Sequence, residues 1–161
     1  MIKKGDMMFE LKLLNFDFNE IKKVYDFCDF INNEYKGYKD WFFYTHIPEL
    51  NQSRITLYVT YNDEIIAISN LKKNKEKKIC TFYVDEKYRN MGIGTFLMEE
   101  SLAWLETDKP LITISESKLK MFKYFIDKYN WNLEVILDDY YKENTKEYCY
   151  NGILRKKKTS N

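Results

Sequence analysis

The chain has 161 residues, enough for a domain with a buried core, and 45% of them are hydrophobic, which excludes an intrinsically disordered protein. Its 26 Lys and Arg residues nearly balance its 25 Asp and Glu residues, so no excess charge draws the chain toward nucleic acid or acidic membranes. No run of about 18 apolar residues is present, so no transmembrane helix is expected.

The first part of the chain is predicted to contain one strand and one helix. Apolar residues alternate over 8–14, which is typical of a half-buried strand. They recur at helical spacing over 20–33, which predicts an amphipathic helix. The segment 36–54 follows neither period and is expected to be irregular.

The middle of the chain is predicted to be a hairpin followed by a third strand. Residues 55–61 and 64–71 are two strand-like runs separated by a two-residue turn signal. The lysine-rich run 72–78 is expected to be an exposed turn. Residues 79–84 are apolar on both faces, which favours a central position in the sheet.

The rest of the chain continues the alternation of helices and strands. The expected elements are a helix at 95–106, a strand at 111–114, a helix at 117–130, and strands at 131–137 and 147–154. Residues 155–161 are expected to be a basic C-terminal tail. This order indicates a single α/β domain over 1–161, built around a mixed sheet.

Three cysteines, Cys28, Cys80 and Cys149, are an odd number without a CxxC pair. We interpret them as reduced and buried, as in a cytoplasmic protein. The N-terminus lacks the apolar region and the cleavage site of a signal peptide. Frequent Lys, Asn, Ile, Tyr and Phe residues, which have AT-rich codons, hint at a bacterial or phage genome.

A glycine-containing elbow joins the predicted strand 79–84 to the predicted helix 95–106. It contains Arg89, Gly92 and Gly94. A helix N-terminus carries unpaired N–H groups and a partial positive charge, and glycines before it let a ligand approach the backbone. The elbow therefore predicts a phosphate-binding site.

Two common phosphate motifs do not fit this elbow. A P-loop would require a lysine before the final Ser or Thr, but Thr95 follows Gly94 directly. A Rossmann fingerprint would require a third small residue where this chain has Leu97. The remaining pattern is Arg-x-x-Gly-x-Gly between a strand and a helix.

Residues 84–97, with the sequence VDEKYRNMGIGTFL, resemble the acetyl-CoA-binding motif of the GNAT N-acetyltransferase superfamily. That motif consists of Arg or Gln, two residues, Gly, any residue, and then Gly or Ala. The order of elements is similar over nearly all of 9–154, and Lys-Tyr-Asn-Trp at 128–131 matches the family's Lys-x-Gly-Phe. The resemblance implies a GNAT-like α/β (α+β) fold, with a mixed, mostly antiparallel central sheet, flanking helices and splayed central strands.

The resemblance also implies an acetyl-CoA-dependent N-acetyltransferase without a metal. A primary amine of a small molecule or protein would attack the thioester directly, with a backbone N–H near Val84 as oxyanion donor. In the family, backbone of the strand before the elbow binds the pantetheine arm, which here corresponds to Phe82, Tyr83 and Val84. The elbow binds the pyrophosphate, which here corresponds to Arg89, Asn90, Met91, Gly92, Ile93, Gly94 and Thr95.

The acid–base groups are less clearly indicated, because Ile126 occupies the position of the family's usual tyrosine. Tyr124 and Tyr129 are the candidates for the acid that protonates the leaving thiolate. His46, the only histidine, and Glu116 are the candidates for the base, with a structural histidine and a helix cap as their alternatives. A water-assisted route is a further alternative.

Other interpretations stay open at this point. Trp41 and Tyr44 could bind an amine acceptor or belong to the core. The departure at Ile126 keeps a non-catalytic CoA-binding or interaction module as the main alternative to an enzyme. The basic residues 72–78 and 155–158 could contact RNA, but a solvated turn and tail are favoured, so we expect neither a nucleic-acid nor a membrane partner. A homodimer is compatible with the resemblance.

Overall fold

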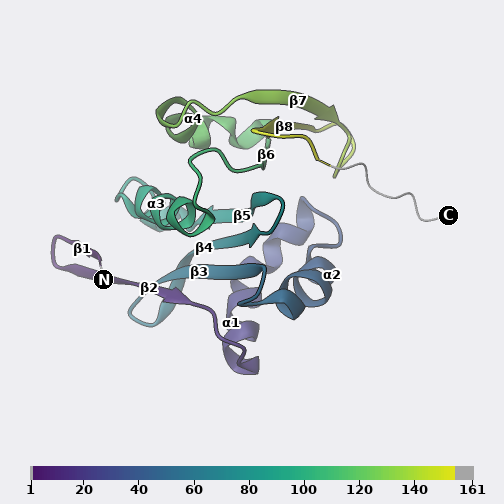
Figure 1. Cartoon of the computed structure of the whole chain (residues 1–161). Coiled ribbons are helices and arrows are strands. Elements are labelled where there is room, and N and C mark those ends of the chain that lie inside the picture. Colours follow the sequence, from purple (N-terminus) through teal and green to yellow (C-terminus); the bar gives the residue numbers. More distant parts are fainter. Residues whose placement is uncertain (1, 155–161) are drawn as a thin grey trace. The chain divides into compact units, whose positions relative to one another are not determined.

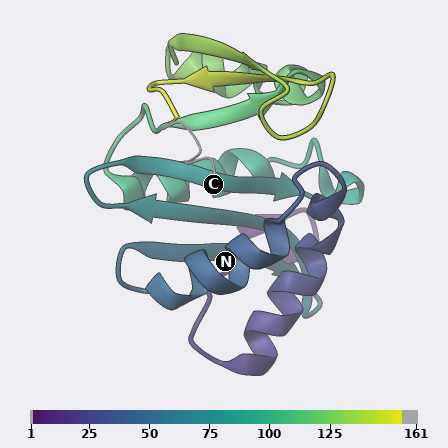
Figure 2. The same ribbon diagram turned by 90° about the vertical axis from the view of Figure 1, so that its right-hand side faces the viewer.

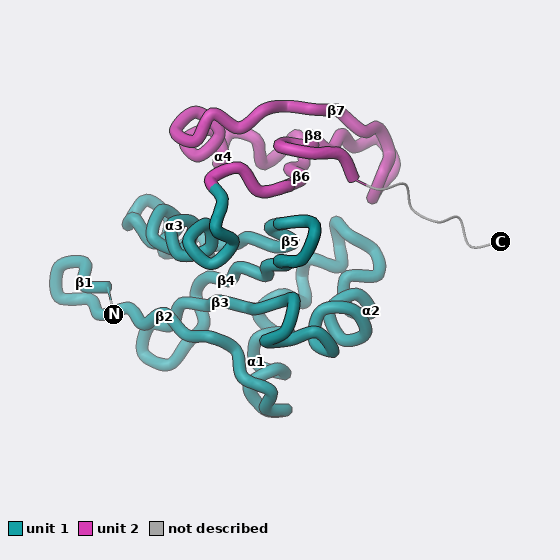
Figure 3. The backbone as a smooth tube through the Cα atoms, in the orientation of Figure 1, with its two compact units in different colours: residues 1–107 teal, residues 108–161 magenta. Residues whose placement is uncertain are grey.

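The structure is a computed structural model that describes residues 2–154, so the predicted tail at 155–161 lies outside the described residues. The chain forms two compact units, one ending at Thr107 and one beginning at Asp108, which Figure 3 shows in different colours. Each unit contains one β-sheet. None of the helices in the described part is long and apolar enough to cross a membrane.

The first unit is built on a five-stranded antiparallel sheet with the order β1-β2-β3-β4-β5 (Figure 1). Its strands are β1 (Ile2–Lys4), β2 (Met7–Leu13), β3 (Arg54–Tyr61), β4 (Glu64–Lys73) and β5 (Lys77–Val84). Four of these confirm predicted strands to within two residues. The hairpin partner β1 was not predicted.

The turns between these strands agree only partly with the sequence prediction. Asn62 and Asp63 adopt φ angles of 49° and 64° between β3 and β4, as expected for a two-residue hairpin turn. The next turn is shorter than the predicted 72–78, because β4 and β5 extend into this run from both sides. Lys72 Nζ donates to Glu76 Oε1 at 2.7 Å across the turn. The prediction that this whole run is an exposed turn was therefore wrong at its ends.

Helices cover both faces of this sheet (Figure 2). The helices of the first unit are α1 (Phe18–Cys28), α2 (Tyr38–Trp41) and α3 (Ile93–Leu105). Ile68 of β4 packs into the cluster that contains α1 residues, whereas the neighbouring Ser69 hydroxyl lies 2.8 Å from that of Ser101 in α3. Since successive side chains of a strand point to opposite faces, α1 and α3 lie on opposite sides of the sheet.

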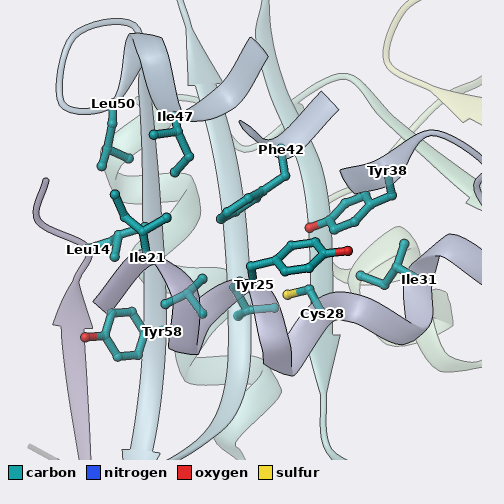
Figure 4. Close-up of a cluster of buried hydrophobic side chains, with 12 residues drawn as sticks. Leu14, Ile21, Tyr25, Cys28, Ile31, Tyr38, Phe42, Ile47, Leu50 and Tyr58 are labelled. Carbon is teal, nitrogen blue, oxygen red and sulfur yellow. The ribbon is translucent and has the colours of Figure 1, made fainter. Parts of the chain in front are cut away.

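A buried core cluster lies between α1, the sheet and the segment 38–50 (Figure 4). Its members are Leu14, Ile21, Val24, Tyr25, Cys28, Ile31, Tyr38, Phe42, Ile47, Leu50, Tyr58 and Ile68. The segment 36–54, predicted to be irregular, is mostly helical. It contains α2, a π-helical turn at Phe42–His46 and a 3-10 turn at Ile47–Glu49. Three helix types with different periods follow one another, so no single hydrophobic period marks them.

The helix predicted at 20–33 ends earlier than expected. α1 is capped at its start by Asp17, whose side chain accepts a hydrogen bond from the backbone N–H of Glu20 at 2.9 Å. It stops at Cys28 and continues as a 3-10 turn over Asp29–Asn33. Ile31 of this turn is still buried in the core cluster, which explains the continuous apolar spacing.

The strand β5 is the last strand of its sheet, where the sequence predicted a central one. Its apolar pattern has another cause, because both of its faces are covered by helices. The Tyr83 ring contacts Phe27 of α1 on one side, with ring centroids 5.7 Å apart, and α3 packs against β5 on the other. The pattern therefore reports covered faces and not the number of neighbouring strands.

The second unit contains a three-stranded antiparallel sheet with the order β6-β8-β7 and one α-helix. Its elements are β6 (Ile112–Ser115), α4 (Leu119–Lys128), β7 (Leu133–Asp138) and β8 (Lys146–Tyr150). Trp131 Nε1 donates to the carbonyl of Asp108 at 2.7 Å, which ties the end of α4 to the start of the unit. All four elements were predicted, with the helix preceded by a 3-10 turn at Glu116–Lys118.

The strands expected to splay, β5 and β6, belong to different sheets. A mixed, mostly antiparallel sheet was expected, and all pairs between the described strands are antiparallel. The structure is thus an α/β arrangement of antiparallel sheets flanked by helices.

Candidate functional site

The elbow between β5 and α3 exposes the start of a helix without a side-chain cap. Gly92 is the N-cap residue and has a φ of 81°, a conformation that glycine adopts readily. The first hydrogen bond of the helix runs from Phe96 N to Gly92 O at 3.1 Å. The preceding N–H groups, those of residues 93–95, therefore have no acceptor within the helix. They can donate to an anion, which the helix dipole also favours.

The chain before Gly92 is held by hydrogen bonds to β4 and within the loop itself. Asp85 N donates to Ile66 O at 2.8 Å, which fixes the end of β5 against β4. The Asp85 carboxylate accepts from Lys87 N at 3.0 Å and starts a 3-10 turn over Glu86–Tyr88. Asn90 then adopts a φ of 63°, so the backbone reverses in the space of a few residues.

The Arg89 side chain contacts three residues on either side of the start of this elbow. Its Nε donates to the carbonyl of Val84 at 2.9 Å, and its guanidinium carbon lies 5.5 Å from the centroid of the Tyr83 ring. An Arg89 terminal nitrogen lies 3.8 Å from the carboxylate of Glu86. Arg89 therefore joins the end of β5 to the loop, and part of its donor capacity is used inside the protein.

A second cation lies beside the elbow, and the sequence analysis did not identify it. An atom at the Cβ position of Gly92 would lie 2.9 Å from Lys4 Nζ and 3.2 Å from Lys4 Cε. Lys4 belongs to β1, far from the elbow in the sequence. Gly5, between Lys4 and the apolar run that follows, is a sequence signal for this hairpin, and in the structure it has a φ of 61°. No nearby residue in the sequence indicates that the Lys4 side chain would lie beside the elbow.

Residues 82–84 of β5, predicted to bind the pantetheine arm, are half-buried. Their strand pairs on one side with Ala67, Ile68 and Ser69 of β4. No strand of the same sheet pairs with the other edge of β5 among the described residues. An edge of this kind offers backbone donors and acceptors to an extended ligand.

His46, a predicted base candidate, is fully buried in the first unit. Its Nε2 lies 2.8 Å from Thr56 Oγ1, and the Thr56 hydroxyl donates to Asn70 Oδ1 at 2.6 Å. Because the Thr56 proton is used toward Asn70, Thr56 accepts from His46, which places the imidazole proton on Nε2. The other nitrogen, Nδ1, is buried without a hydrogen-bond partner within residues 2–154.

The environment of His46 disfavours its charged form. Burial first, and then the positive charge of Arg54, lower its pKa from 6.5 to about 3. The imidazole stacks on Trp41 with ring centroids 5.1 Å apart, and on Phe42 at 5.8 Å. These contacts are those of a neutral structural histidine, the alternative that the sequence left open.

The two aromatic residues predicted to bind the acceptor differ in their surroundings. Trp41 is half-buried, contacts His46, and has the Arg54 guanidinium 5.7 Å from its ring. Tyr44 is 79% exposed. Trp41 is thus part of a packed wall, and Tyr44 is accessible to a partner molecule.

The other acid–base candidates lie in the second unit. Glu116 is exposed at the start of the 3-10 turn before α4, and Tyr124 is 57% exposed on α4. Tyr129 is half-buried and stacks on Trp131 with ring centroids 6.3 Å apart. Lys128 Nζ lies 5.6 Å from the ring centroid of Tyr124 and 5.3 Å from that of Tyr129. Both phenols therefore have a cation nearby.

A comparison with family models decides the class of this protein. The model described as Acetyltransferase (GNAT) family matches residues 18–115, more than half of the chain. The chain belongs to this acetyltransferase family. The match includes β5, the elbow and the whole of α3, so the resemblance read from the elbow is confirmed. A search among curated proteins gives no match.

Solved structures of GNAT acetyltransferases share this fold at low sequence identity. The ribosomal-protein-S18-alanine N-acetyltransferase of Escherichia coli is 13% identical, with a TM-score of 0.64 over 91% of this chain and 97% of that chain. A Bacillus subtilis acetyltransferase in complex with CoA is 14% identical, with a TM-score of 0.61 over 91% of this chain and all of that chain (100%). A Bacillus anthracis protein described as a streptothricin acetyltransferase, in complex with acetyl coenzyme A, is 18% identical, with a TM-score of 0.55 over 66% of each chain.

No metal centre is evident within residues 2–154, where no three His, Cys, Asp or Glu side chains come together as ligands. The elbow instead offers uncapped N–H groups, a glycine in the left-handed conformation and a neighbouring ammonium group. This combination fits a phosphate-bearing ligand.

Proposed function

We propose that this chain is an acetyl-CoA-dependent N-acetyltransferase that acetylates a primary amine of a small molecule or protein. The observation that carries the proposal is the uncapped start of α3 at Gly92, in a chain of the GNAT family. The pyrophosphate of acetyl-CoA would accept hydrogen bonds from the backbone of residues 90–95, beside Arg89. The pantetheine arm would lie along the backbone of residues 82–84.

The proposed reaction is a direct aminolysis of the thioester. The lone pair of a neutral amine attacks the acetyl carbonyl carbon, the C–N bond forms and the C–S bond breaks. The amine loses one proton and the departing CoA thiolate gains one, so the transfer is balanced. A backbone N–H near Val84 would stabilise the oxyanion.

For the proton transfers we propose Glu116 as base candidate and Tyr124 or Tyr129 as acid candidates, with water as the alternative to each. Glu116 and Tyr124 are exposed and Tyr129 is half-buried, so each is more accessible to solvent than the fully buried His46. Tyr44 would be the more accessible of the two predicted acceptor contacts. The proposal includes no further assignment of the amine.

We extend the proposal to the protein as a whole. Both units would form one GNAT-like domain over 1–161. Support comes from two solved GNAT structures, each a single chain that matches 91% of this chain. A cytoplasmic, bacterial origin fits the buried thiols of Cys28 and Cys149, a state that a reducing compartment maintains. A homodimer is a prediction that sedimentation velocity would test.

A non-catalytic CoA-binding or interaction module is the second candidate. It is favoured by Ile126, a half-buried residue of α4 at the position where the family's acid tyrosine is expected. Turnover separates the two candidates, because a binding module would bind acetyl-CoA but release no CoA with any amine. A screen of diamines, amino acids and peptides with thiol detection provides this measurement.

The first experiment is calorimetric titration with acetyl-CoA, CoA and ATP. We expect binding of the first two and none of ATP. Gly92→Glu, which places a carboxylate beside the pyrophosphate, should weaken CoA binding by at least about a hundredfold, since like charges in an interface cost several kcal/mol.

Gly37→Glu is the matched control for this substitution. Gly37 is also the N-cap of a helix with a left-handed φ of 87°, and no atom lies within 4 Å of its Cβ position. Both variants therefore carry the same backbone strain, but only one adds a charge at the elbow. Equal CoA affinity of the two folded variants would show that the site is misplaced.

A further inference from the structure

The N-terminal hairpin brings a lysine to the start of α3. Lys4 pairs with Met7 in the β1–β2 ladder, and its ammonium lies 2.9 Å from the Cβ position of Gly92. Gly92 is the N-cap of α3, so a cation stands at the positive end of the helix dipole. Cations are unfavourable there unless an anion lies between them and the helix.

The hairpin is held against the elbow by a group of aromatic rings. Phe9 of β2 is fully buried, and its ring centroid lies 5.2 Å from that of Tyr61 and 6.2 Å from that of Tyr88. Tyr88 belongs to the 3-10 turn of the elbow, and its ring centroid lies 5.9 Å from that of Tyr61. Packing of β2 against this turn therefore brings the hairpin, and with it Lys4, close to the elbow.

The charges around the elbow leave Lys4 available. The described residues 2–154 include no carboxylate that forms an ion pair with Lys4. Arg89, the other cation at this place, already donates to Val84 O and lies over the Tyr83 ring. An anion at the start of α3 would thus have both the backbone N–H groups of residues 93–95 and the Lys4 ammonium beside it.

We infer that Lys4 is a ligand of the pyrophosphate group of acetyl-CoA, so that the N-terminal hairpin completes the anion site at the start of α3. This inference rests on the proposed function of the elbow. It adds a residue outside the Arg-x-x-Gly-x-Gly pattern and gives Gly92 a second role, because any larger residue there would displace the ammonium group. The ligand class is a nucleotide-like diphosphate.

The test compares Lys4→Met with Lys3→Met in the full chain. Lys3 is the next residue in β1 and pairs with Met8, so its side chain points to the other face of the hairpin. Both variants remove one exposed lysine charge from the same strand. Circular dichroism verifies their folding, and Lys4→Arg tests whether another cation restores binding.

Titrations with CoA and 3′-dephospho-CoA separate the two phosphate groups. We expect Lys4→Met to weaken binding of both ligands by the same factor, about five- to tenfold, as for loss of one exposed charge-assisted hydrogen bond. Lys3→Met should stay within about twofold of the unsubstituted protein, and added salt should reduce the difference between the variants. Lys4→Arg should bind CoA nearly as well as the unsubstituted protein.

Two results would overturn the inference. The first is equal affinity of Lys4→Met and Lys3→Met for CoA. The second is a loss confined to CoA and missing with 3′-dephospho-CoA, which would place Lys4 at the 3′-phosphate. If the unsubstituted protein itself binds neither ligand, the proposed function fails as well, so the two failures are distinguishable.

Discussion

The buried His46 makes a quantitative prediction about stability and pH. Burial is the main cause that lowers its pKa from the ordinary value of 6.5 to about 3 in the folded protein. The unfolded chain therefore binds a proton in the interval between these values and the folded protein does not. The contribution of neutral His46 to the free energy of unfolding is present above pH 6.5 and is lost as the pH decreases toward 3.

The size of the effect follows from the two pKa values. Each pH unit between them costs about 1.4 kcal/mol of unfolding free energy, so lowering the pH from about 7.5 to about 5 should cost roughly 2 kcal/mol. Carboxylates with ordinary pKa values contribute little in this interval, because they titrate near pH 4. A second proton on the imidazole would have no acceptor in the folded state, since Nε2 already donates to Thr56 and Nδ1 is buried without a hydrogen-bond partner within residues 2–154.

Urea unfolding at both pH values measures this loss, with His46→Gln as the variant that cannot titrate. We expect the unsubstituted protein to lose roughly 2 kcal/mol more than the variant. NMR gives an independent measurement, because the chain has a single histidine and therefore a single imidazole to follow. An imidazole that titrates near pH 6.5 in the folded protein, or equal losses in both proteins, would refute the reasoning.

Two further predictions concern the core and the chemistry. Phe42→Ala should destabilise the protein by about 3–5 kcal/mol, because Phe42 is fully buried. Tyr44→Ala, at a side chain that is 79% exposed, should change the free energy of unfolding by less than about 0.5 kcal/mol. Urea unfolding measures both values, and similar losses would contradict the packing. Of Tyr124→Phe and Tyr129→Phe, the variant that removes the acid should lose about a hundredfold in kcat and the other little; unchanged kcat in both would favour water.

Much of the first sheet could be predicted from the sequence because its signals are local. The strand-like runs 55–61 and 64–71 identified β3 and β4, and the turn signal at Asn62-Asp63 identified their connection. The elbow was predicted for the same reason, since Gly92 and Gly94 stand between a strand-like and a helix-like run. These features depend on residues that are close together in the chain.

The environment of His46 could not be predicted, because it depends on residues distant in the sequence. Its partner Thr56 lies on β3, and the next member of the chain of hydrogen bonds, Asn70, lies on β4. Asn70 Nδ2 in turn donates to Tyr38 OH at 3.0 Å. A single histidine between aromatic residues gives no indication of these contacts, so its burial and its lowered pKa emerge only in the folded chain.

The two glycines of the elbow are equivalent in the sequence motif but not in the structure. Gly92 has a φ of 81° and the Lys4 ammonium at its Cβ position. Gly94 lies inside α3 without a positive φ, and its Cβ position is 3.6 Å from Val84 Cγ2, an ordinary contact. The GNAT motif accepts Gly or Ala at this second position. The structure gives a physical reason, because a Cβ atom at Gly94 would have an ordinary φ and an ordinary contact.

This difference predicts opposite effects of the same substitution. Gly94→Ala should stabilise the protein by about 0.5–1 kcal/mol, because Ala loses less backbone entropy than Gly within a helix. Gly92→Ala should destabilise it by about 1–2 kcal/mol, because a Cβ atom is strained in the left-handed conformation. Urea unfolding of both variants measures these values. If Gly94→Ala were as destabilising as Gly92→Ala, the helix would not begin where the structure places it, and the N–H groups assigned to the phosphate would belong to other residues.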